Sequence, residues 1–453
     1  MCRASRRNRY PSSSRRSLGS ATLEFSATEA FGIAASASVG MDADPDEYEV
    51  VVPSLWMGKR PTEDTPTAHA FYDNEVWYSE GAALVCGRCQ HDVISHNRIY
   101  MVGYPMARAI QMLGTTTDYV TIARNTLRYD GSGAIAWLWG VGNLAEYNHI
   151  SKSGLLIVDN EAMQGSKPTS YCTLRFNWVH DSRGLGARYD AAADGEFGSY
   201  NNLEYNVFTR NQQGGFAQKA THAHNYRNSA VGNQVSGASW STGCGDACLD
   251  YDNEDMKIFY CFPSSCVDED GNEDAYTNID SVTRGNVGTM SPVTSNVELP
   301  GDASHNLDLA DVSYGDTPAK QLRALFRDYD NYDYRPLASG PLVDAGIDPS
   351  VAIDGAPATV GSAPDIGAYE AGSEWYWIPG KQYAFATSPV PPDGSTSVLP
   401  DADLMWLQGR DAYSHRVKIV EGATSSVGST VKTLTNDKNV YTPTTVTLTP
   451  GSS

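Results

Sequence analysis

The chain has 453 residues and a formal net charge of −21, with 41% hydrophobic and 19% charged residues. This apolar content excludes wholesale disorder, and no apolar run reaches the roughly 18 residues that a membrane-spanning helix needs. The acidic balance argues against general binding to nucleic acid or to an anionic membrane. Abundant glycine and tyrosine, 41 and 26 residues, together with few charges are typical of an all-β protein.

The N-terminal segment differs in composition from the rest of the chain. Residues 1–16 contain six arginines and no acidic residue. A secretory signal would need an apolar stretch of about 7–15 residues after this charged start, and none follows. We therefore expect residues 1–40 to be a disordered or targeting segment, which precedes a β domain over residues 41–372.

A repeated pattern dominates the first half of the β domain. Six segments have an apolar residue, two variable residues, an asparagine, one variable residue and a second apolar residue. Their asparagines are Asn97, Asn125, Asn148, Asn177, Asn206 and Asn233, with spacings of 28, 23, 29, 29 and 27 residues. Short β-rich segments at this period predict a coil of strands whose apolar side chains stack inward. We expect the asparagines to lie in register at tight bends, where they tolerate left-handed geometry and bond one another along the axis.

Four of the eight cysteines fall within 23 residues, in an acidic, loop-like stretch at about 240–285. They are Cys244, Cys248, Cys261 and Cys266. We expect disulfides among these four, because such bridges would stabilise a loop that has little core of its own. Zinc is the alternative, although their spacings lack the usual CxxC pairs. Cys86 and Cys89 form a separate CxxC without a thioredoxin-like context.

The sequence of the C-terminal part predicts an appended module. Proline and glycine in residues 389–395 mark a turn-rich connection, and we place a linker at 373–396. Residues 402–407 and 415–420 alternate in polarity like sandwich strands. The remaining residues, 397–453, are fewer than the about 100 of a full sandwich, so we expect a partial β-sandwich.

The asparagine repeat resembles the right-handed parallel β-helix family of pectate-lyase-like proteins. Residues 332–346 and 363–370 look like the closing motifs of many secreted bacterial-type β-helix proteins, and residues 397–453 resemble the start of a fibronectin-type-III-like domain. The resemblance implies an all-β solenoid that is extracellular or on the cell surface and acts on polysaccharide. Neither a membrane span nor a nucleic-acid partner is expected, and the chain is expected to be a monomer.

In such a fold side chains fill the interior, so binding and chemistry must lie on the outer wall. Counting 11–14 residues from each asparagine, with strand alternation, places several side chains on one face. They are Trp137, Trp139, Arg188, Asp190 and Lys219. Tryptophan stacks on sugar rings, and arginine pairs with carboxylates or sulfates. The candidate substrate-binding residues are Trp137, Trp139, Arg183 and His180.

One mechanism that fits this face is β-elimination on a uronic acid, in which a base removes the C5 proton while a cation neutralises the carboxylate. Lys219 is the candidate base and Arg188 its partner. His222 and Asp190 complete the candidate catalytic set. Calcium is the candidate cofactor, and its candidate ligands are Asp190, Asp194 and Glu196. Residues 219–228 look loosely like the lysine-bearing turn of the alginate lyase and chondroitinase B family, but no Arg-His-Gly follows on a later turn.

Glycoside hydrolysis is the second mechanism, and it needs two carboxylates about 5–9.5 Å apart. Asp181, Asp190 and Asp194 are candidates, and no sequence pattern selects a pair. A hypothesis from a different class is a non-catalytic surface or matrix protein, in which the long wall binds glycan or serves as a stalk.

Overall fold

The computed structural model describes most of the chain. It covers residues 24–25, 29–31, 55–58 and 69–443, except residues 80, 88, 105–107, 114–116, 138–139, 158–160, 166–168, 191–197, 234–255, 259–279, 293–300, 310–317, 350–351, 420–429 and 436–437. Within this part of the chain, no helix has the length and apolar character needed to cross a membrane.

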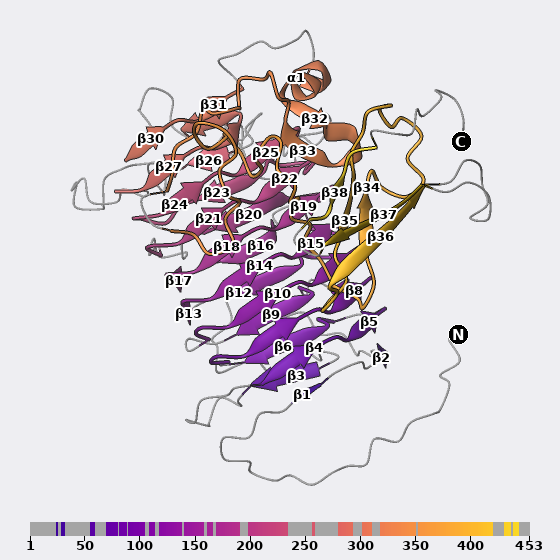
Figure 1. Cartoon of the computed structure of the whole chain (residues 1–453). Helices are drawn as coiled ribbons and strands as arrows, with labels where there is room; N and C mark the ends of the chain where they lie inside the picture. Colours follow the sequence, from indigo (N-terminus) through magenta and orange to yellow (C-terminus); the bar gives the residue numbers. More distant parts are fainter. Residues whose placement is uncertain are drawn as a thin grey trace, which may run out of the picture.

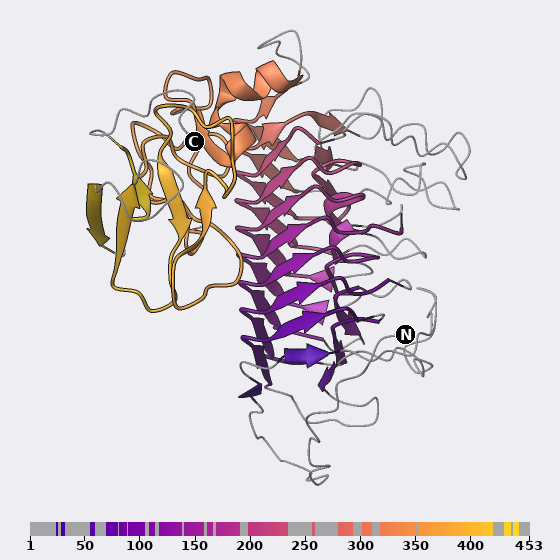
Figure 2. The ribbon, with the colours of Figure 1, turned by 90° about the vertical axis from the view of Figure 1, so that its right-hand side faces the viewer.

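Three stacks of short parallel strands form the body of the molecule (Figures 1 and 2). Sheet A contains β1 (Glu24–Phe25), β4 (Ala70–Tyr72), β7 (Val93–Ser95), β10 (Thr121–Ala123), β14 (Leu144–Glu146), β18 (Thr173–Arg175), β21 (Asn202–Glu204), β24 (His224–Tyr226), β27 (Val282–Arg284) and β30 (Asp302–Ser304). Sheet B contains β2 (Glu29–Phe31), β5 (Glu75–Trp77), β8 (Arg98–Tyr100), β11 (Thr126–Arg128), β15 (His149–Ser151), β19 (Trp178–His180), β22 (Val207–Thr209), β25 (Ser229–Val231), β28 (Val287–Gly288) and β31 (Leu307–Asp308). Sheet C contains β3 (Leu55–Gly58), β6 (Leu84–Gly87), β9 (Ile110–Leu113), β12 (Ile135–Trp137), β16 (Glu161–Gly165), β20 (Leu185–Tyr189), β23 (Phe216–Gln218), β26 (Met256–Ile258) and β29 (Met290–Pro292).

Each coil contributes one strand to each sheet, and a two-stranded ladder of β13 (Gly140–Val141) and β17 (Thr169–Ser170) precedes sheet A. The central residue points inward in β7, β10, β14, β18 and β21, so that Ile94, Ile122, Ala145, Leu174 and Leu203 stack in register. All five are fully buried. This arrangement confirms the predicted fold class, an all-β parallel β-helix followed by a smaller β part.

A ladder of buried asparagines joins the coils at the corner between sheets A and B. The backbone N–H and Nδ2 of Asn97 both donate to Oδ1 of Asn125 at 2.9 Å. The same pair of bonds recurs from Asn125 to Asn148, then to Asn177 and to Asn206. The in-register stacking predicted from the repeat is therefore confirmed for these five residues.

The sixth predicted member, Asn233, is not part of this ladder. Asn206 instead donates to Asn228, and the ladder continues through Asn286. Asn233 belongs to the next corner, where it accepts from the backbone N–H of Asn211 at 3.0 Å. The prediction failed because the inward position of this coil is the polar Asn225 rather than an apolar residue, so the repeat pattern matched the neighbouring corner.

The left-handed conformation at the corner also falls on a different residue than predicted. The residue before each asparagine takes it, with φ of 58° at Arg124, 52° at Tyr147 and 53° at Phe176. This residue turns the chain and projects outward. The asparagine itself can then point its amide into the wall and bridge two coils.

A C-terminal strap, residues 366–383, runs back along this corner from late coils to early ones. Ala368 N–H donates to Ser229 Oγ at 3.0 Å, whereas Lys381 Nζ reaches Asp73 Oδ1 at 2.8 Å. Midway, Trp377 packs edge-on against the stacked rings of Tyr147 and Phe176. Within the predicted linker, residues 373–396, residues 376–381 are therefore buried. They cover the aromatic side chains that the left-handed residues of this corner project outward.

The end of the β-helix is closed by α1 (Pro318–Leu325), β32 (Phe326–Asp328), the 3₁₀ helix η2 (Tyr329–Asn331) and β33 (Asp333–Pro336). Beyond the strap, β34 (Thr387–Val390), β35 (Leu404–Leu407) and β38 (Val440–Tyr441) form one antiparallel sheet, and β36 (Ser414–Ile419) pairs with β37 (Thr430–Thr435). These strands lie beside the β-helix (Figure 2). The fibronectin-type-III-like character of this module stays a prediction.

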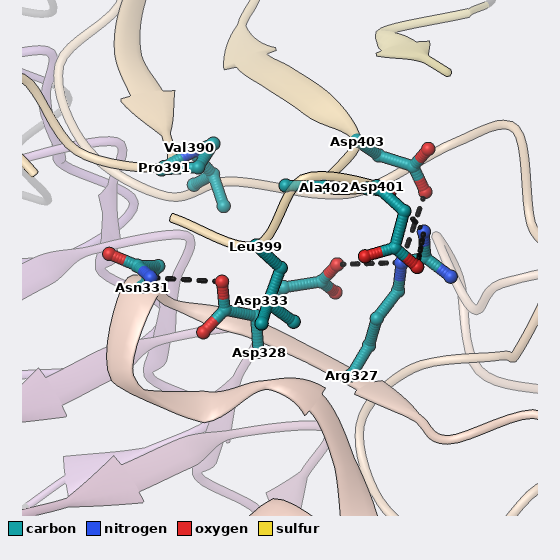
Figure 3. A pocket seen from close by; sticks show the side chains of 10 residues that line it. All are labelled: Arg327, Asp328, Asn331, Asp333, Val390, Pro391, Leu399, Asp401, Ala402 and Asp403. Atoms are coloured by element: carbon teal, nitrogen blue, oxygen red, sulfur yellow. Dashed lines mark hydrogen bonds and ion pairs between the residues drawn. The ribbon is translucent and has the colours of Figure 1, made fainter. Parts of the chain in front are cut away.

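Buried charge pairs join this module to the closing segment beside a small pocket, whose lining residues include Arg327, Asp333 and Asp403 (Figure 3). Arg335 Nη2 contacts Asp333 Oδ2 at 2.6 Å and Asp403 Oδ2 at 2.7 Å. Arg327 Nε lies 3.4 Å from the same Asp403 oxygen. The two arginines neutralise the carboxylates that come together here, so this small pocket is best explained as a structural junction.

The structure describes three of the eight cysteines. Cys86 and Cys89 form a disulfide inside the coil, and Cys172 is a buried free thiol. Burial raises the pKa of the Cys172 thiol to about 12. The predicted pairing of Cys244, Cys248, Cys261 and Cys266 falls outside the described residues.

Candidate functional site

The structure brings together three of the four predicted catalytic residues on the outer face of sheet C. Lys219 Nζ lies 2.6 Å from Asp190 Oδ1, and Arg188 Nη2 lies 2.8 Å from both Asp190 Oδ2 and Glu161 Oε1. Strand register explains the cluster, since Arg188 and Ala217 are partners on adjacent coils and Lys219 follows two residues later. The cluster continues to Arg108, 3.7 Å from Glu161.

Lys219 is not the exposed wall lysine that the sequence predicts, because only 4% of the residue is accessible. Burial lowers the pKa of its amine, and nearby Arg188 lowers this pKa further, whereas the Asp190 carboxylate raises it. The cluster of Arg188, Asp190, Lys219 and Glu161 is therefore a desolvated network of alternating charges.

Replacing Lys219 with alanine is expected to lower the free energy of unfolding by about 2 kcal/mol, since Asp190 would lose a buried partner. Urea denaturation would measure this change. Arg323→Ala is the control, because Arg323 pairs with Asp330 at an exposed position and should cost at most about 0.5 kcal/mol. Equal stability of the Lys219 variant and the parent would contradict the structural role.

The described residues do not fit the predicted calcium site. Asp190, the one candidate ligand that the structure describes, already contacts the cationic groups of Lys219 and Arg188. Two cations this close would repel a divalent ion. Asp194 and Glu196 lie outside the described residues, and we derive no step through calcium.

Two of the predicted substrate-binding residues, His180 and Arg183, make their described contacts away from this cluster. His180 lies on sheet B, where Nδ1 is 2.5 Å from Asp181 Oδ2 and Nε2 is 2.8 Å from His149 Nε2. Burial lowers the pKa of both histidines. Arg183 donates to the Leu155 carbonyl at 3.0 Å.

The two predicted tryptophans are less fully described. β12 places the backbone of Trp137 in register with Gly165, on the sheet C strand next to it. Trp139 lies outside the described residues. The sugar-stacking role of both tryptophans stays a prediction.

His222 belongs to a different surface, an open groove of about 660 Å³ over sheet A. Its ring stacks on Tyr200 with centroids 4.7 Å apart, and Tyr200 stacks on Tyr171 at 4.8 Å. Tyr171 and Tyr200 are 58% and 41% exposed. Tyr171, Tyr200 and His222 take the left-handed backbone conformation at the corner that precedes sheet A on successive coils. The coil repeat therefore builds an aromatic column along the groove.

A column of polar side chains on sheet A lines the groove. Arg175, Glu204 and Tyr226 are successive partners in the strand register, and Glu146 precedes them on the neighbouring coil. Arg175 Nη2 contacts Glu146 Oε2 at 2.8 Å and lies 3.8 Å from Asp354 Oδ2. Asp354 also lines the groove, together with Pro349, Ala352 and Ile353.

Glu204 is the most unusual group in this groove. The residue is 8% exposed, and within the described part of the chain no donor hydrogen-bonds its carboxylate. Burial raises the pKa of Glu204 to about 7, and the positive charge of Arg175 opposes this rise only in part. A carboxyl group in an open groove can therefore hold its proton near neutral pH.

Sequence reasoning missed Glu204, Tyr171 and Tyr200 as site residues. The two tyrosines carried a usable signal, since Tyr171 and Tyr200 lie six residues before Asn177 and Asn206. The sequence around Glu204 carried no such signal, because the groove that surrounds this residue includes Asp354, 150 residues later in the chain.

The comparisons with known proteins find distant structural similarity. No family model and no curated protein matches the sequence. Among solved structures, the chain is similar to one titled "Crystal structure of pectate lyase Pel9A", with a TM-score of 0.30 and 14% identity over 77% of this chain and 87% of that one. The proposals below therefore rest on the residues of this chain.

Proposed function

We propose that this protein is an extracellular or cell-surface, carbohydrate-active β-helix protein that binds polysaccharide in the groove over sheet A. The observation that carries the proposal is the exposed column of Tyr171, Tyr200 and His222 beside an open groove of about 660 Å³. Groove volumes of this order suit small-molecule and sugar ligands, and aromatic rings with polar tips suit sugar surfaces.

The charges in the groove favour an acidic polysaccharide as the ligand. Arg175, His222 and His224 can each face a carboxylate or a sulfate, and Arg175 carries a permanent charge. The Cys86–Cys89 disulfide supports an oxidising, extracellular setting. We propose a monomer, without a nucleic-acid partner.

Replacing Tyr171 with alanine is expected to weaken polysaccharide binding about tenfold, because one exposed ring contributes roughly 1–1.5 kcal/mol of contact energy. Affinity electrophoresis in gels that contain polygalacturonate, alginate or the neutral glucan laminarin would measure the change. Tyr413→Ala is the matched control, since Tyr413 is 92% exposed on the C-terminal module. The proposal fails if the parent is not retarded in any gel, or if both variants migrate alike.

β-Elimination at the sheet C cluster is the second candidate function. It is favoured by the meeting of Lys219 and Arg188 at Asp190 on one face of sheet C, where burial shifts the pKa of Lys219 in the direction that suits a base for the C5 proton of a uronic acid. Release of unsaturated products from polygalacturonate or alginate, followed by ultraviolet absorbance, would test it. Binding without any cleavage would favour the non-catalytic, glycan-binding hypothesis.

A further inference from the structure

We propose that Glu204 is the proton donor of a glycoside-hydrolysing site in the groove over sheet A, with Asp354 as the carboxylate that activates water. This inference rests on the proposed function, because it needs a sugar chain in the same groove. It adds a reaction and two residues with defined roles.

The position of Glu204 differs from that of an ordinary buried carboxylate. Buried acids are normally paired, because desolvation of an unpaired charge is costly. The neighbouring cation, Arg175, directs its guanidinium to Glu146 and Asp354 instead. Within the described chain Glu204 therefore lacks a donor for its carboxylate, although it lines an open groove. A protonated carboxyl group resolves this conflict, since it carries no charge and keeps a proton to donate.

Asp354 provides the second carboxylate in a contrasting environment. Its side chain is 97% exposed, and its Oδ2 lies 3.8 Å from Arg175 Nη2. When one carboxyl group is buried and the other is hydrated beside a cation, the first acts as the acid and the second as the base. Both groups line the groove, Glu204 from sheet A and Asp354 from a segment 150 residues later in the chain.

The reaction balances with water as the only co-reactant. Glu204 donates its proton to the glycosidic oxygen as the bond from that oxygen to the anomeric carbon breaks. Asp354 accepts a proton from water while the water oxygen bonds to the anomeric carbon. The products are a reducing end of inverted configuration and a free hydroxyl group. Transfer of a proton through solvent from Asp354 to Glu204 restores the starting state.

The pH dependence of the reaction follows from the acid. Glu204 must be protonated to act, and its raised pKa is about 7. We therefore expect the rate to fall about tenfold for each pH unit above 7. The same group should affect folding: the parent loses stability as pH rises from about 4.5 to 7, because the unfolded chain ionises first. Glu204→Gln should unfold at higher urea concentration than the parent at pH 8, with a smaller difference at pH 4.

The test compares the parent, Glu204→Gln, Asp354→Asn and Glu374→Gln on polygalacturonate, alginate and laminarin. Reducing ends and unsaturated products are measured at pH 6, alongside binding in affinity gels. We expect the parent to release reducing ends without unsaturated products. Glu204→Gln should bind like the parent and release reducing ends at least about 100-fold more slowly. Asp354→Asn should also be slowed, whereas Glu374→Gln, at an exposed position of the C-terminal strap, should match the parent.

The outcomes separate this inference from the proposed function. Binding of a polysaccharide without release of reducing ends, or full activity of Glu204→Gln, overturns the hydrolytic role and leaves the binding proposal standing. A parent that binds none of the three polysaccharides overturns the proposed function and the inference together. Equal urea midpoints of the parent and Glu204→Gln at pH 8 contradict the protonated state of Glu204, whatever the activity.

Discussion

Replacing Asn177 with alanine is expected to lower the free energy of unfolding by on the order of 4 kcal/mol. Oδ1 of Asn177 accepts two bonds from Asn148, at 2.8 Å from its backbone N–H and 3.1 Å from its Nδ2. Nδ2 of Asn177 donates to the Ala145 carbonyl at 2.9 Å and to Asn206 at 3.0 Å. Each donor left unsatisfied in a dry wall costs about 1–3 kcal/mol. The loss is therefore a large part of the stability of a typical domain.

Urea denaturation followed by intrinsic fluorescence would measure the change. Asn202→Ala is the matched control, because its amide lies at the surface and makes one weak bond, to Thr173 Oγ1 at 3.3 Å. This control should lose at most about 1 kcal/mol. A similar loss in both variants would show that the ladder is not the source of the stability.

Arg227→Met is expected to destabilise the fold by about 3–5 kcal/mol, because it leaves the buried carboxylate of Glu370 without its cationic partner. Arg227 is 1% exposed and pairs with Glu370, which is equally buried. Its Nε also donates to the Gly367 carbonyl at 3.1 Å. Since both partners belong to the C-terminal strap, the substitution should also weaken the attachment of the strap to the wall.

The double variant Arg227→Met, Glu370→Gln serves as the control for this interpretation. Removing the second charge should recover part of the lost stability in urea denaturation, because no uncompensated carboxylate remains. An additive, larger loss in the double variant would show that the pairing of charges is not what the single variant disturbs.

The coiled part of the fold could be predicted from the sequence because each coil repeats a local rule. An apolar residue points inward, the second residue after it turns the corner, and the asparagine that follows bonds the next coil. The rule failed at Asn233, where Asn225 occupies the inward position and hides the repeat. The same regularity placed Arg188, Asp190 and Lys219 on adjacent coils, because sheet C preserves the spacing from one coil to the next.

Contacts made by the strap and by the 349–354 segment could not be predicted in the same way. The burial of Glu204 depends on groove walls that lie far away in the sequence, and the assignment of His222 to the groove depends on stacking against Tyr200. No local pattern encodes such contacts. The predicted exposure of Lys219 failed for a related reason, since an outward-facing residue becomes buried when neighbouring charged side chains pack around it.

The strap changes how the coils of this protein unfold. In a coiled repeat each turn touches only its neighbours, so turns at an end can melt while the rest stays folded. Here Ser229 and Asp73 lie on coils that are far apart along the axis, yet one segment binds both. Fraying of the early coils therefore also breaks contacts of the chain's last third. The strap makes distant coils thermodynamically cooperative, and it can add this cooperativity only after the coils that precede it in the sequence have been synthesised.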